Sequence, residues 1–363
     1  MARKQIILTF IAVGLFTASL VGFSFVDAQQ PSAKSPAATP TPTPSVSDDD
    51  EIIKVDTEVV NVLFTAQDRS RRLITNLAQS DVRILENDKV QEITSFTKQV
   101  DLPLSLAILI DTSISQERTL PYEKAAAISF LESVVRPTKD EVSVISFTGD
   151  STLEQGMTNN MTRLRRAIDR IQFVPPSGYI GGSVIINGGS VPGTPPASSD
   201  NQMTAGSTAI WDSIWVTSDE ILGPAPEKTR RAIILLSDGV NTSGRKKLDD
   251  AIQAALKAEA IIYAVGVGDD FYGGVDRGSM NKIAEKTGGR AFFPREEREL
   301  RDAFKQIEDE MRSQYLIAYE PSDQKLDGSY RKIEIQLTNS LLQKDKVKVT
   351  HRQGYFAKTA QKK

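Results

Sequence analysis

The sequence predicts an α/β protein with a doubly wound, mainly parallel sheet, together with a small β-sandwich. Apolar runs at 104–110, 232–236 and 260–267 have the length of strands and lack strict alternation, which is typical of strands buried on both faces. Helical patterns separate these runs, as expected when parallel strands are joined by crossover helices. Segments near both ends of the chain instead alternate apolar and polar residues, which favours antiparallel strands with one buried face.

Residues 1–28 have the features of a signal peptide. Arg3 and Lys4 precede an apolar stretch, and Val26-Asp27-Ala28 provides a small-x-small cleavage site before Gln29. We therefore expect an exported protein that is periplasmic, displayed at the cell surface or secreted. The apolar stretch is also long enough for the alternative, in which an uncleaved N-terminus anchors the chain in a membrane.

A linker follows the signal peptide. Residues 29–51 are rich in Pro, Thr and Ser, which predicts an extended, disordered segment.

Two short β segments flank the α/β part. Residues 52–101 and 321–356 alternate apolar and polar side chains, and neither is large enough to form a stable sheet alone. We expect them to pack together as one β-sandwich, with the α/β domain at 102–320 inserted between them and a tail at 357–363.

Helices and strands alternate through the α/β domain. Helices are expected at 120–135, 161–171, 208–221, 247–259, 279–286 and 296–312. Strands are expected at 104–110, 141–147, 231–236, 260–267, 291–293 and 315–319, with the last one closing the sheet.

Composition excludes several classes of function. The net charge of −3 gives no electrostatic footprint for nucleic acid. The chain has no cysteine, which excludes disulfides and thiol nucleophiles, and its one histidine, His351, lies in a C-terminal strand pattern. We therefore expect neither an enzyme nor a small-molecule substrate, although a metal-assisted hydrolase remains the enzymatic alternative.

Polar side chains follow two of the buried strands. Asp111, Ser113 and Ser115 come just after 104–110, and Asp238 follows the second run. Parallel strands deliver these groups to the same edge of the sheet, where ligands bind in open α/β folds. Thr208 places another hydroxyl in a loop that opens a helix. Such hard oxygen donors suit Mg²⁺, Mn²⁺ or Ca²⁺.

Together these five residues resemble the metal-ion-dependent adhesion site (MIDAS) of the von Willebrand factor type A (VWA) domain, which has a Rossmann-like sheet. The family pattern is Asp-x-Ser-x-Ser, then a Thr, then an Asp, and no element is missing here. The resemblance implies that hydroxyls bind the ion directly, that carboxylates act partly through water, and that an open position captures an Asp or Glu of a protein partner.

These features predict an exported, metal-dependent protein-binding module for protein–protein interaction or cell adhesion, with Mg²⁺, or else Mn²⁺ or Ca²⁺, as cofactor. The alternative is a structural or scaffolding envelope protein whose metal only stabilises the fold.

The layout of the whole chain also resembles a bacterial group of exported VWA-related proteins, typified by acidobacterial members. These proteins carry a β segment ahead of an Asp-Thr-Ser motif, here at 111–113, and end near Arg-x-Gly-Tyr, here at 352–355.

A long segment rich in Gly, Ser and Pro precedes Thr208. Residues 175–207 are interpreted either as a rim that contacts a partner beside the metal or as a tolerated surface insertion. On the first interpretation, Tyr179 and Ile180 are the candidate partner-binding residues, because exposed apolar groups can anchor a partner.

Overall fold

The computed structural model describes residues 59–98, 101–175, 179–180, 183–184, 207–226, 228–268 and 274–359. The chain divides into two units, Met1–Lys54 and Val55–Lys363, and every described residue belongs to the second. The expected signal peptide and linker, and most of the expected tail, lie outside the described residues. Within the described ranges, no helix combines the length and apolar character needed to cross a membrane.

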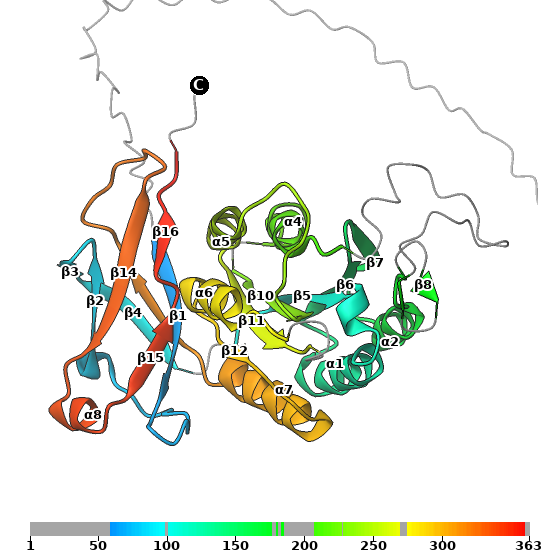
Figure 1. The fold of residues 1–363 in the computed structure, drawn as a ribbon. Coiled ribbons are helices and arrows are strands. Elements are labelled where there is room, and N and C mark those ends of the chain that lie inside the picture. The colour runs from blue at the N-terminus through cyan, green and yellow to red at the C-terminus, as the bar shows by residue number, and fades with distance from the viewer. Residues whose placement is uncertain are drawn as a thin grey trace, which may run out of the picture. The chain divides into compact units, whose positions relative to one another are not determined.

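A six-stranded sheet forms the centre of the α/β part (Figure 1). Its strands, in spatial order, are β12 (Ala291–Phe292), β11 (Ala260–Gly266), β10 (Arg230–Ser237), β5 (Leu104–Asp111), β6 (Glu141–Phe147) and β7 (Ser151–Thr158). All neighbours are parallel except β6 and β7, which are antiparallel. The doubly wound, mainly parallel fold class is therefore confirmed.

Helices cover both faces of this sheet. One face carries α1 (Leu120–Val134), α2 (Met161–Arg170) and α7 (Glu297–Arg312), and the other carries α4 (Ile210–Val216), α5 (Leu248–Lys257) and α6 (Arg277–Thr287) (Figure 1). Successive residues of β5 point to opposite faces, so Ile108 joins the first core and Leu109 the second. This two-sided burial explains the continuous apolar run in the sequence.

Short elements complete the α/β part. They are the 3₁₀ turn η2 (Ile114–Gln116), the π-helical turn η3 (Thr217–Leu222), β8 (Tyr179–Ile180) and β9 (Ser183–Val184). The helix expected at 208–221 is thus a short α-helix that continues as a π-helical turn.

The antiparallel part contains two four-stranded sheets. The first has the order β15 (Lys348–His351), β1 (Val60–Gln67), β13 (Tyr315–Tyr319), β4 (Ile93–Lys98). The second has the order β16 (Gly354–Phe356), β14 (Tyr330–Leu337), β2 (Val82–Glu86), β3 (Lys89–Gln91), with η1 (Gln79–Asp81) and α8 (Ser340–Lys344) beside it. Both sheets combine strands from the two ends of the described chain, and their side chains share one apolar core.

The prediction that 315–319 closes the α/β sheet is wrong. These residues form β13, which pairs with β1 and β4 in the antiparallel part. The side chains explain the placement: the Tyr315 ring stacks on Phe64 with 4.9 Å between centroids, and the Tyr319 hydroxyl donates to buried Glu86. We propose that the boundary between the two parts falls after α7 rather than after residue 320.

Candidate metal centre

The two predicted carboxylates lie at the same edge of the central sheet. Strands β5 and β10 are parallel neighbours with Ile110 in register with Leu236, so Asp111 and Asp238 both come at the carboxyl ends of their strands. Both side chains are buried, as are the nearby Ser113 and Ser115. The topology therefore brings four of the five predicted ligands to one edge.

Local turns hold the first three groups. The Asp111 carboxylate accepts hydrogen bonds from the Ser113 amide at 2.9 Å and from the Ser237 hydroxyl at 2.6 Å. The turn η2 then brings Ser115 back, so that its Oγ lies 3.2 Å from Ser113 Oγ. Both carboxylate oxygens of Asp111 thus accept hydrogen bonds from the protein. The Ser113 and Ser115 hydroxyls lie side by side, where their oxygens could serve as neutral metal ligands.

A second turn carries Asp238. Ser237 Oγ accepts from the Gly239 amide at 3.0 Å while it donates to Asp111, so one hydroxyl ties the two loops together. Gly239 has a φ of +80°, and a Cβ there would lie 2.7 Å from Met280 Cγ. Position 239 in the Ser-Asp-Gly sequence therefore requires glycine, because no other residue fits this turn without strain.

Backbone contacts bring Thr208 to the same edge. Its carbonyl accepts from the amides of Thr242 and Ser243 at 2.9 and 3.0 Å, and the next residue, Ala209, donates to the Thr148 carbonyl at 2.7 Å. Thr148 follows β6 and Thr242 follows the end of β10, and these strands flank β5. Thr208, which is buried, therefore lies across the end of β5, where Asp111 stands.

Burial dominates the electrostatics of the two acids. It raises the pKa of Asp111 to about 7, against the opposing hydrogen bonds from Ser113 and Ser237, and the charge of Asp238 raises the pKa further. Burial also raises the pKa of Asp238, and a hydrogen bond from Ser115 opposes the rise. Both acids are therefore hard to ionise at this buried edge. A divalent cation bound between them would stabilise their ionised forms.

The donor chemistry fits a hard cation. Among the described residues, no group of three His, Cys, Asp or Glu side chains could hold a metal ion. Any ion at this edge would therefore need hydroxyl ligands in addition to the two carboxylates. Serine and threonine hydroxyls with carboxylates suit Mg²⁺, Mn²⁺ or Ca²⁺ better than softer metals.

Sequence reasoning missed two supporting residues around Asp111. Ser237 is the hydroxyl that joins the two loops, and its position directly before Asp238 at a strand end was the available signal. Gln116 donates from Nε2 to the Val267 carbonyl at 3.1 Å and so fixes η2 against the loop after β11.

A third residue, Glu123 on α1, was also missed. It is fully buried, and neither carboxyl oxygen has a hydrogen-bond partner among the described residues. Burial raises its pKa to about 8, the nearby Thr119 hydroxyl opposes the rise, and the charges of Asp111 and Asp238 add to it. Ala127 and Phe130, four and seven positions further on, are buried as well, so helical periodicity placed this acid on the core face.

The structure describes only the backbone of the two predicted partner-binding residues. Tyr179 and Ile180 form β8, which pairs with β9 in the antiparallel sense. Their side chains lie outside what the structure describes, so their role stays a prediction.

Comparison with known families gives a match over part of the chain. The von Willebrand factor type A domain family matches residues 198–306, a stretch that includes Thr208 and Asp238 and begins after the Asp111 loop. This stretch of the chain is therefore similar to part of a von Willebrand factor type A domain. No curated protein matches the chain.

Several solved structures have a similar fold at low identity. Proximal thread matrix protein 1 from the mussel byssus is 18% identical, with 62% of this chain and 51% of that chain covered and a TM-score of 0.45. The chain thus spans about half the length of that protein. A form of it with a zinc-occupied MIDAS motif gives 18% identity, coverage of 62% and 50%, and a TM-score of 0.46. BatB from Bacteroides thetaiotaomicron gives 17% identity, coverage of 58% and 100%, and a TM-score of 0.41.

Proposed function

We propose that this chain is an exported, metal-dependent protein-binding module of the adhesion type. Asp111, Ser113, Ser115, Thr208 and Asp238 would hold Mg²⁺, or else Mn²⁺ or Ca²⁺, and the ion would capture an Asp or Glu side chain of a partner protein. The observation that carries this proposal is the convergence of two carboxylates and three hydroxyl-bearing residues at one edge of the sheet.

The hydrogen bonds suit such a device. A bound divalent ion would supply a positive, Lewis-acidic position for the carboxylate of the partner. Both oxygens of Asp111 accept hydrogen bonds from the protein, which supports an arrangement in which Ser113 and Ser115 contact the ion and the carboxylates act partly through water. Neutral direct ligands leave more of the charge of the ion available to a partner.

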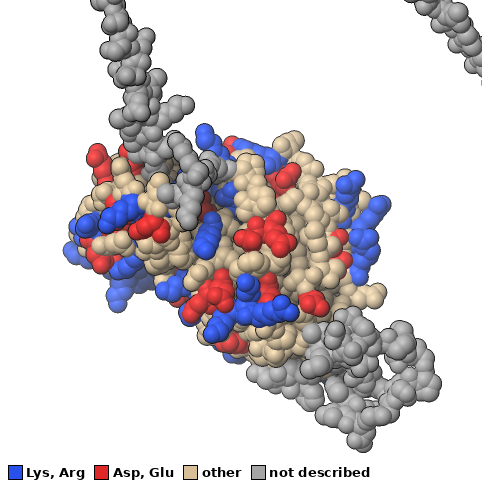
Figure 2. Space-filling model, turned by 90° about the horizontal axis from the view of Figure 1, so that it is seen from above, with Lys and Arg blue, Asp and Glu red and all other residues tan. Residues whose placement is uncertain are grey.

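The surroundings of the site favour binding over catalysis. His351, the one histidine of the chain, lies on β15 in the antiparallel part, opposite Phe64 of β1. A protein partner also agrees with the surface charge, since acidic and basic side chains are interspersed over the face seen in Figure 2 and give no extended basic field for nucleic acid. We therefore propose that the module has no catalytic step and no small-molecule substrate at this site.

The protein would work outside the cytoplasm, in the periplasm, at the cell surface or as a secreted chain. This proposal rests on residues 1–28, with membrane anchoring by an uncleaved N-terminus as its variant.

One observation also favours the second candidate, a structural envelope protein with a stabilising ion. Asp111 and Asp238 are buried acids with raised pKa, so an ion would stabilise the folded state whether or not a partner exists.

Calorimetric titration with Mg²⁺ and Mn²⁺ tests the site. The unaltered protein should show saturable binding and Asp111→Asn should show none. Asp249→Asn, which changes an exposed acid paired with Lys282 on the neighbouring helix, should bind normally. Equal binding by Asp111→Asn would refute the ligand assignment.

Binding to immobilised Asp- and Glu-containing peptides, in Mg²⁺ and in chelator, then separates the two candidates. Capture that requires both the metal and Asp111 supports the adhesion module. Metal-induced thermal stabilisation without any metal-dependent capture supports the structural role.

A further inference from the structure

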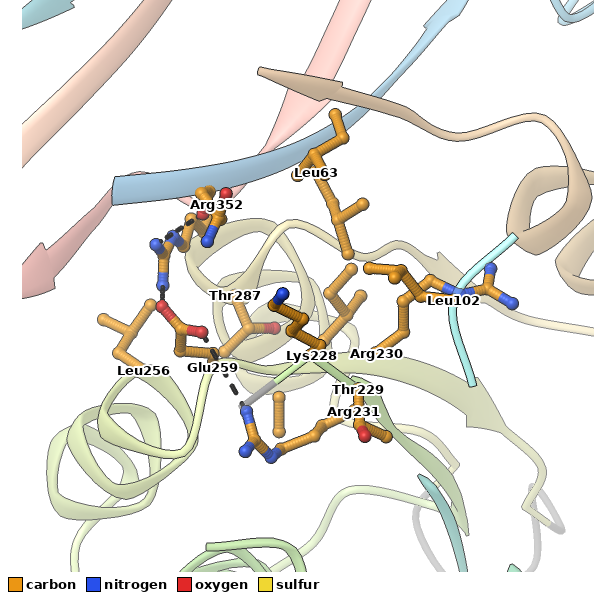
Figure 3. Close-up of a pocket in the computed structure, with 14 residues that line it drawn as sticks. Leu63, Leu102, Lys228, Thr229, Arg230, Arg231, Leu256, Glu259, Thr287 and Arg352 are labelled. Atoms are coloured by element: carbon orange, nitrogen blue, oxygen red, sulfur yellow. Dashed lines mark hydrogen bonds and ion pairs between the residues drawn. The ribbon is translucent and has the colours of Figure 1, made fainter. Parts of the chain in front are cut away.

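A second site lies at the opposite edge of the central sheet from the metal centre. It is a cavity of about 240 Å³ at the amino ends of β10 and β11, where Arg230, Arg231 and Ala260 begin their strands (Figure 3). Asp238, by contrast, follows the carboxyl end of β10. The cavity is therefore separate from the proposed metal site.

Both parts of the protein contribute apolar walls to this cavity. Leu63 of β1 and Leu316 of β13 come from the antiparallel part, whereas Leu102 and Ile261 come from the α/β part. These side chains form a surface that suits a hydrocarbon chain.

The charged side chains of the cavity are unbalanced. Lys228, Arg230, Arg231 and Arg352 line it, and Glu259 is the single acid among the lining residues. The Glu259 carboxylate pairs with Arg352 at 3.0 Å and lies 3.9 Å from Arg231 (Figure 3). One acid faces four cations, so the cavity has an excess of positive charge.

The remaining partners of these arginines do not neutralise them. Arg231 donates to the carbonyls of Leu222 and Ala225, and Arg230 to the Met311 carbonyl. These acceptors are neutral, so they fix the guanidinium groups without removing their charge.

One cationic group at the cavity, the ammonium group of Lys228, is free to receive a ligand. Lys228 is exposed at the cavity, takes part in no ion pair within the described part of the chain, and directs its ammonium group into the cavity in Figure 3. Arg352 is 7% exposed, and its guanidinium is already held by Glu259 at 3.0 Å and by the Asn61 carbonyl at 2.7 Å.

The backbone also holds Glu259 in an unusual conformation. Its φ is +53°, in the left-handed region that residues with a Cβ rarely adopt. Glu259 directly follows the C-cap residue Ala258 of α5, and a left-handed residue at this position commonly ends a helix. The turn thus sets the position of the Glu259 carboxylate that pairs with Arg352.

We propose that this cavity binds a small amphipathic monoanion, a medium-chain carboxylic acid of the fatty-acid type. The carboxylate lies at Lys228, and the hydrocarbon chain covers Leu63, Leu102 and Leu316. The volume lies below the range of about 300–1,000 Å³ that is typical of sites for drug-sized ligands, so it accepts one short chain and excludes a two-chain lipid. A ligand here contacts both parts of the protein and strengthens their association.

Calorimetric titration of the full chain with sodium octanoate, below its micelle-forming concentration, tests the proposal. Saturation at one site is expected. Octan-1-ol has the same tail without the charge, and acetate has the same head without the tail, so both should bind at least tenfold more weakly.

Two variants locate the site and one serves as a control. Lys228→Gln should weaken octanoate binding at least tenfold, and Leu63→Phe should abolish it by filling the cavity. Lys89→Gln changes an exposed lysine on β3 and should bind as the unaltered protein does. Because Lys228 is exposed, its replacement is compatible with folding, and an unchanged Mg²⁺ titration checks this independently of the ligand.

Three results would overturn the proposal. They are the absence of octanoate binding, equal binding by Lys228→Gln, and equal binding of octan-1-ol and octanoate. None of them bears on the metal centre, since the Mg²⁺ titration reports on that site alone.

Discussion

Replacement of Glu123 by glutamine should stabilise the metal-free protein at alkaline pH and change it little at acidic pH. Glu123 is fully buried on α1, and its carboxyl oxygens have no hydrogen-bond partner among the described residues. Glutamine has nearly the same shape and cannot ionise. The variant therefore removes the free energy of ionising a buried acid while keeping its volume.

The expected magnitude follows from the pKa of Glu123. Burial raises it from 4.5 to about 8. At 1.36 kcal/mol per unit of pKa, this corresponds to about 5 kcal/mol as an upper value. Because the folded state keeps its proton between these two pKa values while the unfolded state loses it, the stability of the unaltered protein falls as pH rises through this window.

Urea unfolding in chelator at pH 4.5, 6.5 and 8.5 would measure the effect. The difference in unfolding free energy between Glu123→Gln and the unaltered protein should grow with pH in favour of the variant. Glu132→Gln, which removes an exposed acid of α1 paired with Arg165, is the matched control and should show little dependence on pH. A difference that is the same at pH 4.5 and at pH 8.5 would refute the reasoning.

Two further predictions concern the metal centre and the antiparallel core. Because burial raises the pKa of Asp111 to about 7, protons compete with the ion, and Mg²⁺ affinity should fall up to about tenfold per pH unit below pH 7; calorimetry at pH 5.5 and 8 would reveal it, and a flat profile would contradict it. Arg331→Met should destabilise the fold by about 3–5 kcal/mol in urea unfolding, because it leaves Glu86 buried without its ion-pair partner. The double variant Arg331→Met with Glu86→Gln should recover part of this loss, and no recovery would show that the pair is not the cause.

The parallel strands could be predicted because their signal is local. Each of β5, β10 and β11 is buried along its whole length, so each appears in the sequence as an apolar run of strand length. The shared edge of the four predicted ligands on β5, β10 and their loops follows from the same signal, since the order of strands in a parallel sheet decides which loops lie together.

The sheet to which β13 belongs and the existence of β7 could not be predicted from local sequence. The run Tyr-Leu-Ile-Ala-Tyr of β13 has the pattern of a parallel strand, yet β1, about 250 positions earlier, and β4 pair with it. Strand β7 is an edge strand without a single fully buried residue, so it lacks an apolar pattern altogether. Non-local pairing and edge exposure are not encoded in short windows of sequence.

Glu123 shows why part of the site also escaped prediction. A charged residue in a helix is normally assigned to the solvent face, and here the periodicity of Ala127 and Phe130 contradicted that rule. Burial raises the pKa of this acid, and the charges of Asp111 and Asp238 add to the rise, so Glu123 is buried in its neutral form near pH 7. Local rules fail at this position because groups from three separate elements interact there.

The contacts between the antiparallel part and the α/β part leave the edge with the proposed metal site uncovered by the antiparallel part. Among the described residues, Arg290 forms an ion pair with Glu310 at 2.8 Å and donates to Gln67 of β1, while Gln353 donates to the Lys286 carbonyl. Lys286 and Arg290 precede β12, and Arg352 meets Glu259 just before β11, so these contacts lie at the amino edge of the central sheet. The antiparallel part is therefore attached at the end opposite Asp111 and Asp238. An adhesion site requires such an arrangement, because an ion buried between the two parts would stabilise the fold without reaching the carboxylate of a partner.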